Sequence, residues 1–409
     1  MNLSISSLHP LKLMTLSWSI WLILFVLMPV SYGNVEYRVA GVITLLALLF
    51  CFALGVLFFD MLPKRPPTSV VRMSIESDIY KFVFYIILVA GCFGVLLKMY
   101  EHFILHGLLS QPSFFAYKLS RMQNQLNSGL IGVLSALTYP FGLVALMLNI
   151  KFQYLTGVVK KTAIWLIGCF WFFDAVFLSS LTTIMYLFAF LFITIILNNA
   201  LNRDQFTHIS WLKLLIGLMV VISYFIYLTF FRVDLDFIPI ALEARALIPN
   251  FDIDSVFVFA IINFLHYLVH GVVEWFRLFN HVGLDVHYLG AYQFYPIVKI
   301  FSVFGLNIPS FLELAAVAHK TGVYTTFFGG FILDFGYYSF LAAFVLGVLS
   351  MSLYNGLFNA SFVSYLVYPI LAAQLLFSSI MNIFSGVVVY YLVSVLLSVV
   401  LLHTYKRHE

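Results

Sequence analysis

The feature that most constrains the fold is a series of long apolar runs spread along the whole chain. Ten of them are long enough to cross a bilayer, and they lie near residues 13–30, 39–59, 80–97, 129–149, 162–178, 181–197, 211–231, 336–355, 361–380 and 385–402. About 20 apolar residues in a helix cross the hydrocarbon core, where backbone groups must be paired within the segment. The pattern predicts an all-α polytopic membrane protein, with a single integral membrane domain over residues 1–409. Because the turn between the fifth and sixth runs is short, one long, tilted or broken helix is the alternative there.

Composition excludes a soluble enzyme, a disordered chain and a secreted disulfide scaffold. Hydrophobic residues make up 63% of the chain and charged residues 9%, whereas soluble domains average about 45–50% and about 25%. So few charged groups cannot cover a surface that faces water. The net charge of +4 is small and scattered, so nucleic acid is not an expected partner.

Lysine and arginine in the short loops predict the orientation of the chain. With the N-terminus in the cytoplasm, one side collects most of these residues. The short loops of the opposite side hold only Arg38, Lys98, Lys118 and Arg121. We therefore expect both termini in the cytoplasm, with residues 232–335 forming one large external or periplasmic loop.

The large loop is polar but contains two further apolar runs, 256–275 and 292–304. If both crossed the bilayer, the number of spans would rise to twelve, so the range is about 10–12. We expect re-entrant or interfacial helices instead, because the first run contains ionisable residues. Such groups are costly in the bilayer unless they face a polar cavity.

Four ionisable residues share one face of a helix predicted over residues 255–279. They follow each other at steps of four, four and three, and they are His266, His270, Glu274 and Arg277. This pattern favours a strip of acid, base and cationic groups that lines a cleft at the outer headgroup level. One alternative is a helix lying flat on the membrane with this face in water. Another is a metal site at the two histidines, for which a third ligand is only a guess.

Two arginines at the start of the loop suit a phosphate ligand. Arg232 ends the seventh apolar run, and Arg245 follows among carboxylates. A guanidinium group holds phosphate through two parallel hydrogen bonds and keeps its charge. The alternatives are that Arg232 reaches only the lipid phosphates and that Arg245 pairs with a neighbouring carboxylate.

Two segments of the loop, 288–296 and 319–330, combine aromatic rings, hydroxyl groups and glycines. Aromatic faces beside hydroxyl and amide donors suit sugar rings, and glycine lets the backbone approach a bulky ligand. The segments therefore indicate carbohydrate binding. The alternative is the belt of tyrosines found at any membrane interface.

Three short motifs resemble those of the Wzy-type O-antigen and capsule repeat-unit polymerases. They are Gly290-Ala291-Tyr292-x-Phe294-x-Pro296, Gly322-Val323-Tyr324-Thr325-Thr326-Phe327 and Asp334-Phe335-Gly336. The layout, with many spans and one large periplasmic loop two-thirds along the chain, is similar as well. The resemblance implies a multi-span C-type glycosyltransferase fold in the bacterial inner (cytoplasmic) membrane, with its active face and the large loop in the periplasm. It also implies metal-independent glycosyl transfer on undecaprenyl-pyrophosphate-linked oligosaccharides.

The hypothesis is that the growing glycan moves, with inversion, from undecaprenyl pyrophosphate to the terminal sugar of an incoming lipid-linked repeat unit. Fixed cations would bind the pyrophosphate, and the candidates are Arg232, Arg245, Arg277 and Lys320. A base would activate the acceptor hydroxyl group, and the candidates in falling order of preference are His319, Glu274, His270 and Asp334. Sugars would be oriented by Tyr288, Tyr292 and Tyr324. The expected partners are the lipid-linked oligosaccharides, membrane lipids and a chain-length regulator protein. No cofactor or metal is expected.

Two alternative functions share part of this pattern. An O-antigen ligase uses the same carrier and topology but passes the glycan to the lipid A core. A lipid-linked oligosaccharide flippase or other secondary transporter would place charges inside the spans along a central pathway. Here the span interiors are nearly uncharged apart from Asp174.

Overall fold

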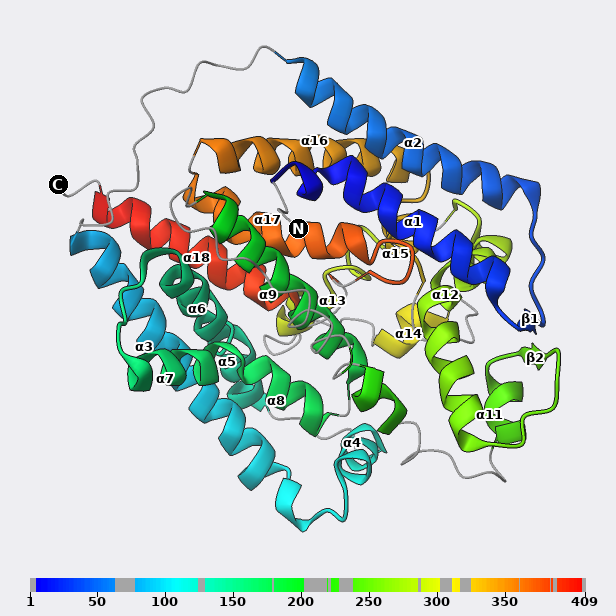
Figure 1. The fold of residues 1–409 in the computed structure, drawn as a ribbon, viewed down its shortest axis with the longest axis horizontal. Helices are drawn as coiled ribbons and strands as arrows, with labels where there is room; N and C mark the ends of the chain where they lie inside the picture. Colours follow the sequence, from blue (N-terminus) through cyan, green and yellow to red (C-terminus); the bar gives the residue numbers. More distant parts are fainter. Residues whose placement is uncertain are drawn as a thin grey trace.

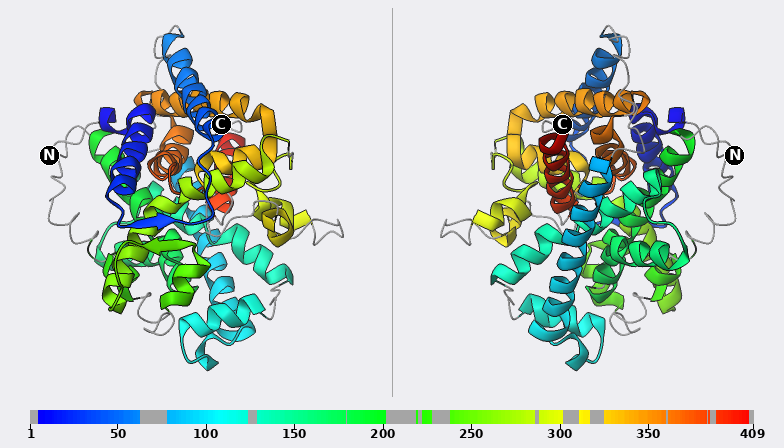
Figure 2. Two further views of the ribbon diagram at one scale, coloured as in Figure 1. Left: turned by 90° about the vertical axis from the view of Figure 1, so that its right-hand side faces the viewer. Right: turned by 90° about the vertical axis from the view of Figure 1, so that its left-hand side faces the viewer.

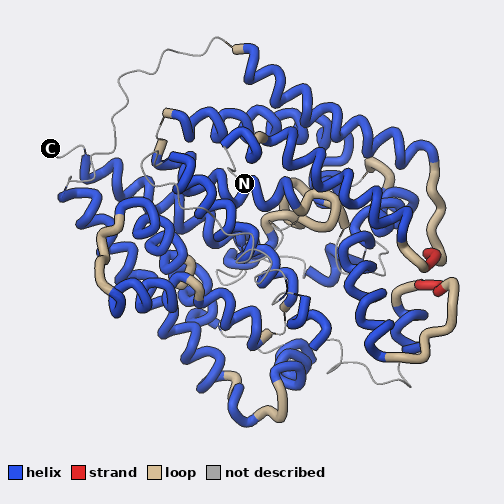
Figure 3. Tube along the Cα trace, viewed as in Figure 1, coloured by secondary structure: helices blue, strands red, loops and turns tan. Residues whose placement is uncertain are grey.

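The computed structural model describes residues 5–62, 78–123, 129–178, 180–201, 219, 222–227, 238–285, 288–301, 311–316, 325–359, 361–382, 384 and 388–406. The described chain is helical almost throughout (Figures 1 and 3). Its α-helices are α1 (Pro10–Leu27), α2 (Val39–Met61), α3 (Asp78–Tyr100), α4 (Phe114–Gln123), α5 (Gly129–Thr138), α6 (Phe141–Phe152), α7 (Val158–Gly168), α8 (Phe170–Phe177), α9 (Leu181–Leu201), α11 (Ile238–Ala244), α12 (Val256–Val282), α13 (Tyr295–Ile300), α14 (Phe311–Ala316), α15 (Phe327–Phe335), α16 (Ser339–Phe358), α17 (Phe362–Leu376) and α18 (Val388–Lys406).

Seven helical segments of the described chain are long and apolar enough to cross a membrane. They are Pro10–Leu27, Val39–Met61, Asp78–Ser110, Gly129–Phe152, Thr183–Leu201, Val256–Val282 and Phe327–Phe358. The predicted all-α polytopic membrane protein is therefore confirmed, and the described residues contain fewer long spans than the ten to twelve expected of the whole chain. Two further apolar helices, α17 and α18, are shorter. Most of the predicted span 211–231 lies outside the described residues.

Two predicted apolar runs are interrupted or short in the structure. The run 162–178 is divided at Cys169 into α7 and α8, and neither helix alone is long enough to cross a bilayer. In the run 292–304, the described part forms a turn followed by the six-residue helix α13. That helix is much too short to cross a bilayer.

The bundle is built around α17, which contacts α1, α9, α16 and α18 (Figures 1 and 2). The tightest pair is α2 with α16, which lie side by side. A Cβ atom on Gly55 would lie 2.0 Å from the carbonyl oxygen of Phe344, and one on Gly347 would lie 2.2 Å from that of Phe52. Small residues let two apolar helices approach closely, which is how helices associate in lipid.

A break in the helical backbone lies deep in the bundle. Helix α17 ends at Leu376, and the buried residues 377–382 follow it without regular structure. The hydroxyl groups of Ser379 and Ser17 lie 2.9 Å apart, and Ser17 is close to the midpoint of α1. Non-helical backbone at this depth requires burial in protein or a polar cavity.

Helix α12 crosses α1 and α2 at a steep angle instead of running beside them (Figure 1). The indole of Trp21 in α1 donates to the carbonyl oxygen of Val269 at 3.1 Å, and that of Trp275 donates to Gly41, close to the start of α2, at 3.2 Å. The length and hydropathy of α12 also suit a membrane crossing. That α12 is a re-entrant or interfacial helix therefore stays a prediction.

A two-stranded antiparallel sheet holds the loop after α1 against the loop before α12. Strand β1 (Val30–Tyr32) pairs with β2 (Leu247–Pro249), with Tyr32 opposite Leu247. We call this end of the molecule, where α1 ends and α2 begins, the β1 side. It is the side predicted to face the periplasm.

Candidate functional site

The predicted polar face of α12 is buried inside the protein. His266, His270, Glu274 and Arg277 expose only 5%, 2%, 0% and 4% of their surfaces. The alternative in which this face of the helix lies in water is therefore wrong. Helix α12 packs its ionisable residues against the protein, and in an apolar bundle such residues are a sign of function.

An ion pair joins the last two residues of this face. One Nη atom of Arg277 contacts a carboxylate oxygen of Glu274, three residues earlier on the helix. Its other Nη atom donates to the carbonyl oxygen of Gly33 at 2.8 Å. Because Gly33 follows β1, this arginine holds the loop between α1 and α2 against α12. The charge of Arg277 is thus already paired within the protein.

Two histidines continue the same face. His270 donates from Nδ1 to the carbonyl oxygen of Tyr267 at 3.0 Å, so Nε2 is the ring nitrogen that can gain or lose a proton. Nδ1 of His266 lies 3.5 Å from the hydroxyl group of Tyr32 in β1. The two imidazole rings are 5.1 Å apart. Among the described residues, no group of three or more His, Cys, Asp or Glu side chains is arranged to hold a metal ion.

Two tyrosine hydroxyl groups near β1 stay protonated and can serve as hydrogen-bond donors. Burial raises the pKa of Tyr32 and of Tyr37 above the usual tyrosine value, and the charge of Arg277 lowers both by a smaller amount.

Arg245 is half-buried beyond the end of α11. Its Nη1 donates to Ala241 at 3.1 Å. The charges of Arg245 and Arg277 both act on His266, so these two cations lie near one histidine.

Asp334 is buried and binds the turn before α13. Its Oδ1 accepts the backbone N–H of Tyr292, and its Oδ2 accepts that of Gln293, both at 2.9 Å. The two motifs that contain Tyr292 and Asp334 are therefore in direct contact, although they lie about forty residues apart. Burial raises the pKa of Tyr292 to about 12, helped by the Asp334 carboxylate.

These bonds predict the effect of Asp334→Asn. The carboxamide would present an NH₂ group to a backbone N–H donor, and leaving such a buried donor unpaired costs about 1–3 kcal/mol. We expect a lower midpoint of thermal unfolding in detergent and faster proteolysis of residues 288–301. The exposed Asp254→Asn is the matched control and should change neither. Normal stability with loss of activity alone would instead favour Asp334 as the base.

The remaining predicted site residues are only partly placed. Tyr288 is half-buried, and its N–H donates to the carbonyl oxygen of Leu333 at 3.0 Å. It packs against the small cluster formed by Tyr292, Leu333 and their neighbours. The other four lie outside the described residues, and they are Arg232, His319, Lys320 and Tyr324.

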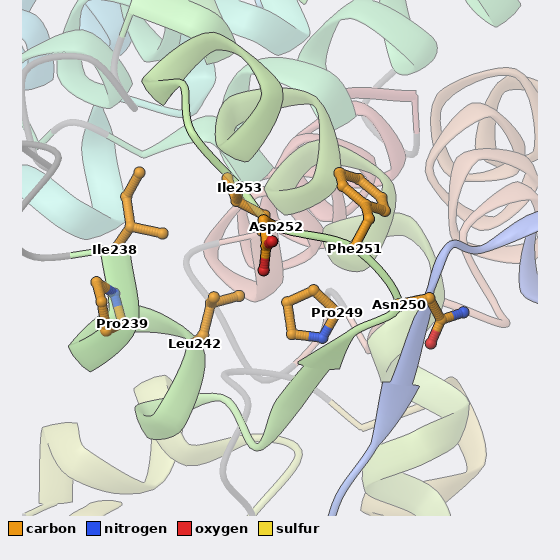
Figure 4. Close-up of a pocket in the computed structure, with 8 residues that line it drawn as sticks. All are labelled: Ile238, Pro239, Leu242, Pro249, Asn250, Phe251, Asp252 and Ile253. Atoms are coloured by element: carbon orange, nitrogen blue, oxygen red, sulfur yellow. The ribbon is translucent and has the colours of Figure 1, made fainter.

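An open cavity of about 460 Å³ lies beside β2 (Figure 4). It is lined by Ile238, Pro239, Leu242, Pro249, Asn250, Phe251, Asp252 and Ile253. Its walls come from α11, β2 and the loop that follows, and they include none of the predicted site residues.

Sequence reasoning missed a second buried polar network at the end of α3. Glu101 begins the π-helical turn η2 (Glu101–Leu105) and accepts hydrogen bonds from Lys98, Arg121 and Ser135 at 2.9, 2.9 and 3.0 Å. The ring of His102 lies between Tyr117 and Asp174, with Nδ1 at 2.8 Å from the hydroxyl group and Nε2 at 2.7 Å from the carboxylate.

The composition of this network explains why it was missed. Lys98 and Arg121 look like ordinary loop cations, and Asp174 stands alone in an apolar run. The partner of Asp174, His102, lies 72 residues earlier in the sequence. The one available signal is the presence of Asp174 in a span, since a carboxylate there needs a partner.

Fold and site together define a multi-pass, all-α membrane protein with ionisable residues buried on the β1 side and at the end of α3. Comparison with known proteins takes the identification no further, since no protein-family model, curated protein or solved structure matches the chain.

Proposed function

We propose that this protein is a membrane glycosyltransferase that polymerises oligosaccharide repeat units carried on undecaprenyl pyrophosphate. The observation that supports it best is the buried face of α12, which holds a carboxylate, two histidines and an arginine and is bonded through Arg277 to the loop after β1. A transfer reaction at a lipid pyrophosphate needs cations for the leaving group and a base for the acceptor. This face supplies both kinds of group without a metal.

The arginines would stabilise the pyrophosphate leaving group. As the bond at the anomeric carbon breaks, negative charge develops on the pyrophosphate, and fixed guanidinium groups in a poorly hydrated site stabilise it. Of the two candidate arginines that the structure describes, Arg245 is more exposed than Arg277. The ion pair with Glu274 fixes the orientation of Arg277. Arg232 and Lys320 remain proposals of the same kind outside the described residues.

Among the described candidates for the base, His270 has the most suitable geometry. Both oxygens of Asp334 accept backbone N–H groups, and Glu274 is paired with Arg277. Since Nδ1 of His270 donates to a backbone carbonyl group, Nε2 is the ring nitrogen that would accept the proton of the acceptor hydroxyl group. His319 remains the other histidine proposed for this role, outside the described residues.

The experiment is deletion of the gene and complementation, with lipopolysaccharide and capsule profiles as the readout. A strain without the polymerase should carry single repeat units and no ladder of longer glycans. His270→Ala should fail to restore the ladder, because loss of general base help lowers the rate by about 10²- to 10⁴-fold. The exposed His281→Ala on the same helix is the control and should restore it.

The same experiment separates the alternatives. A ligase deletion would leave no glycan on the surface lipid, and a flippase deletion would leave lipid-linked repeat units in the cytoplasmic leaflet. A normal ladder in the deletion strain would rule out the polymerase.

A further inference from the structure

A buried polar region lies beside the α12 face, at the point where α15 begins. The backbone N–H of Thr326 donates to Gly271 in α12 at 3.1 Å, and that of Phe327 donates to Ser378 at 2.9 Å. These bonds place the start of α15 between α12 and the break after α17. In membrane proteins, such breaks at depth form substrate sites.

The buried polar side chains of this region include Gln293, Thr326 and Asn382, which expose 1%, 0% and 6% of their surfaces. Within the part of the chain that the structure describes, Nε2 of Gln293 and Oγ1 of Thr326 have no hydrogen-bond partner. A buried polar group without a partner is costly, and few remain in native proteins without a functional reason. These two atoms therefore indicate a ligand.

Gly330 brings two of the three side chains together. It lies four residues after Thr326, which caps the start of α15. A Cβ atom on Gly330 would lie 2.8 Å from Nδ2 of Asn382 and 3.1 Å from Cγ of Gln293. The side chains of Gln293, from the turn before α13, and of Asn382, from the break after α17, thus meet at this glycine, four residues along the chain from Thr326.

The chemistry of this group favours a neutral ligand rich in hydroxyl groups. Two carboxamides and one hydroxyl group supply donors and acceptors without formal charge. The nearby carboxylate of Asp334 is occupied by backbone N–H groups. A pyrophosphate would need cations, which the α12 face supplies and this group does not.

We propose that Gln293, Thr326 and Asn382 form a subsite that holds hydroxyl groups of one sugar of the lipid-linked oligosaccharide. The subsite rests on the proposed function, because the sugar is that of the glycosyl substrate. Its position next to Gly271 would set the sugar beside the histidines of α12. The three residues position the substrate and take no part in bond making.

Two variants that keep shape but remove polarity test this subsite, namely Gln293→Met and Thr326→Val. Because Nε2 of Gln293 and Oγ1 of Thr326 have no hydrogen-bond partner among the described residues, both variants should unfold at the wild-type temperature or above it. The full-length protein in nanodiscs should show KM for undecaprenyl-pyrophosphate-linked repeat units raised about 3- to 10-fold in each variant, with little change in kcat. The double variant should show a larger rise.

The control variant is Thr194→Val, whose buried hydroxyl group bonds within its own helix. It should leave KM unchanged. The affinity for undecaprenyl pyrophosphate without sugar should be the same in wild type and in the double variant, because the subsite binds sugar.

Three results would overturn the proposal. If KM is unchanged in the double variant, the residues do not contact the sugar, even where Thr326→Val lowers stability. If affinity for the bare carrier falls as much as that for the glycosylated one, the ligand is not the sugar. If the wild-type protein neither binds nor extends the lipid-linked oligosaccharide, the proposed function fails together with the subsite.

Discussion

Replacing Arg277 by alanine is expected to cost about 3–5 kcal/mol of stability, because it removes the partner of a buried carboxylate. Glu274 is fully buried, and Arg277 is the residue that pairs with it and joins it to the loop after β1. The measurement is the midpoint of thermal unfolding in detergent, together with the amount of protein in the membrane. An unchanged midpoint would contradict the role of the ion pair.

A double variant of the Glu274–Arg277 ion pair separates the effect on stability from the effect on activity. Glu274→Met combined with Arg277→Met removes both charges at similar volume, and apolar replacement of a buried pair is often neutral or stabilising. We expect near-wild-type stability. Polymer formation should still fall by about 100-fold or more, as when a transition-state donor is removed. Normal polymer length in this stable double variant would exclude Arg277 from the pyrophosphate site.

The control for both variants is Arg38→Ala on the β1 side. Arg38 pairs with Glu36, and both side chains are mostly exposed. Surface pairs contribute little because water and salt screen them. Stability and the polymer ladder should therefore stay as in the wild type.

The second large effect is expected for Glu101→Gln. The Glu101 side chain is 2% exposed and neutralises Lys98 and Arg121, whose side chains are 11% and 19% exposed. The carboxamide would bring an NH₂ group toward these cations and leave their charges unbalanced. Removing one partner of a buried pair costs about 3–5 kcal/mol.

The order of effects within this network is a further part of the same test. Glu101→Gln should lower the unfolding temperature most, because one carboxylate serves both cations. Arg121→Met should lower the unfolding temperature less than Glu101→Gln does, since the Arg121 side chain is more exposed than those of Glu101 and Lys98. Equal unfolding temperatures for all variants and the wild type would show that the network does not stabilise the fold.

The sequence was a good guide wherever a local pattern decided the structure. Hydropathy predicted most of the long helices, since a segment in lipid must satisfy its own backbone. The steps between His266 and Arg277 predicted their common face, which depends only on helix geometry. The motif around Tyr292 and the one at Asp334 were both singled out, and the structure shows them in contact.

The same patterns said nothing about which polar groups are paired. Asp334 was a candidate base, yet its carboxylate binds the turn that contains Gln293. Arg277 was a candidate for the pyrophosphate, and it is paired with Glu274 and bonded to Gly33. Their partners are set by side-chain direction and by the packing of distant segments.

What the sequence by itself determined is the class of the protein, its helical segments and the residues that share the polar face of α12. Only the tertiary structure decided that this face is buried, that α17 stops near the midpoint of α1, and that His102 meets Asp174. The reason is physical: the bilayer and the helical repeat act on neighbouring residues, whereas charges and hydrogen bonds are satisfied between segments that packing brings together.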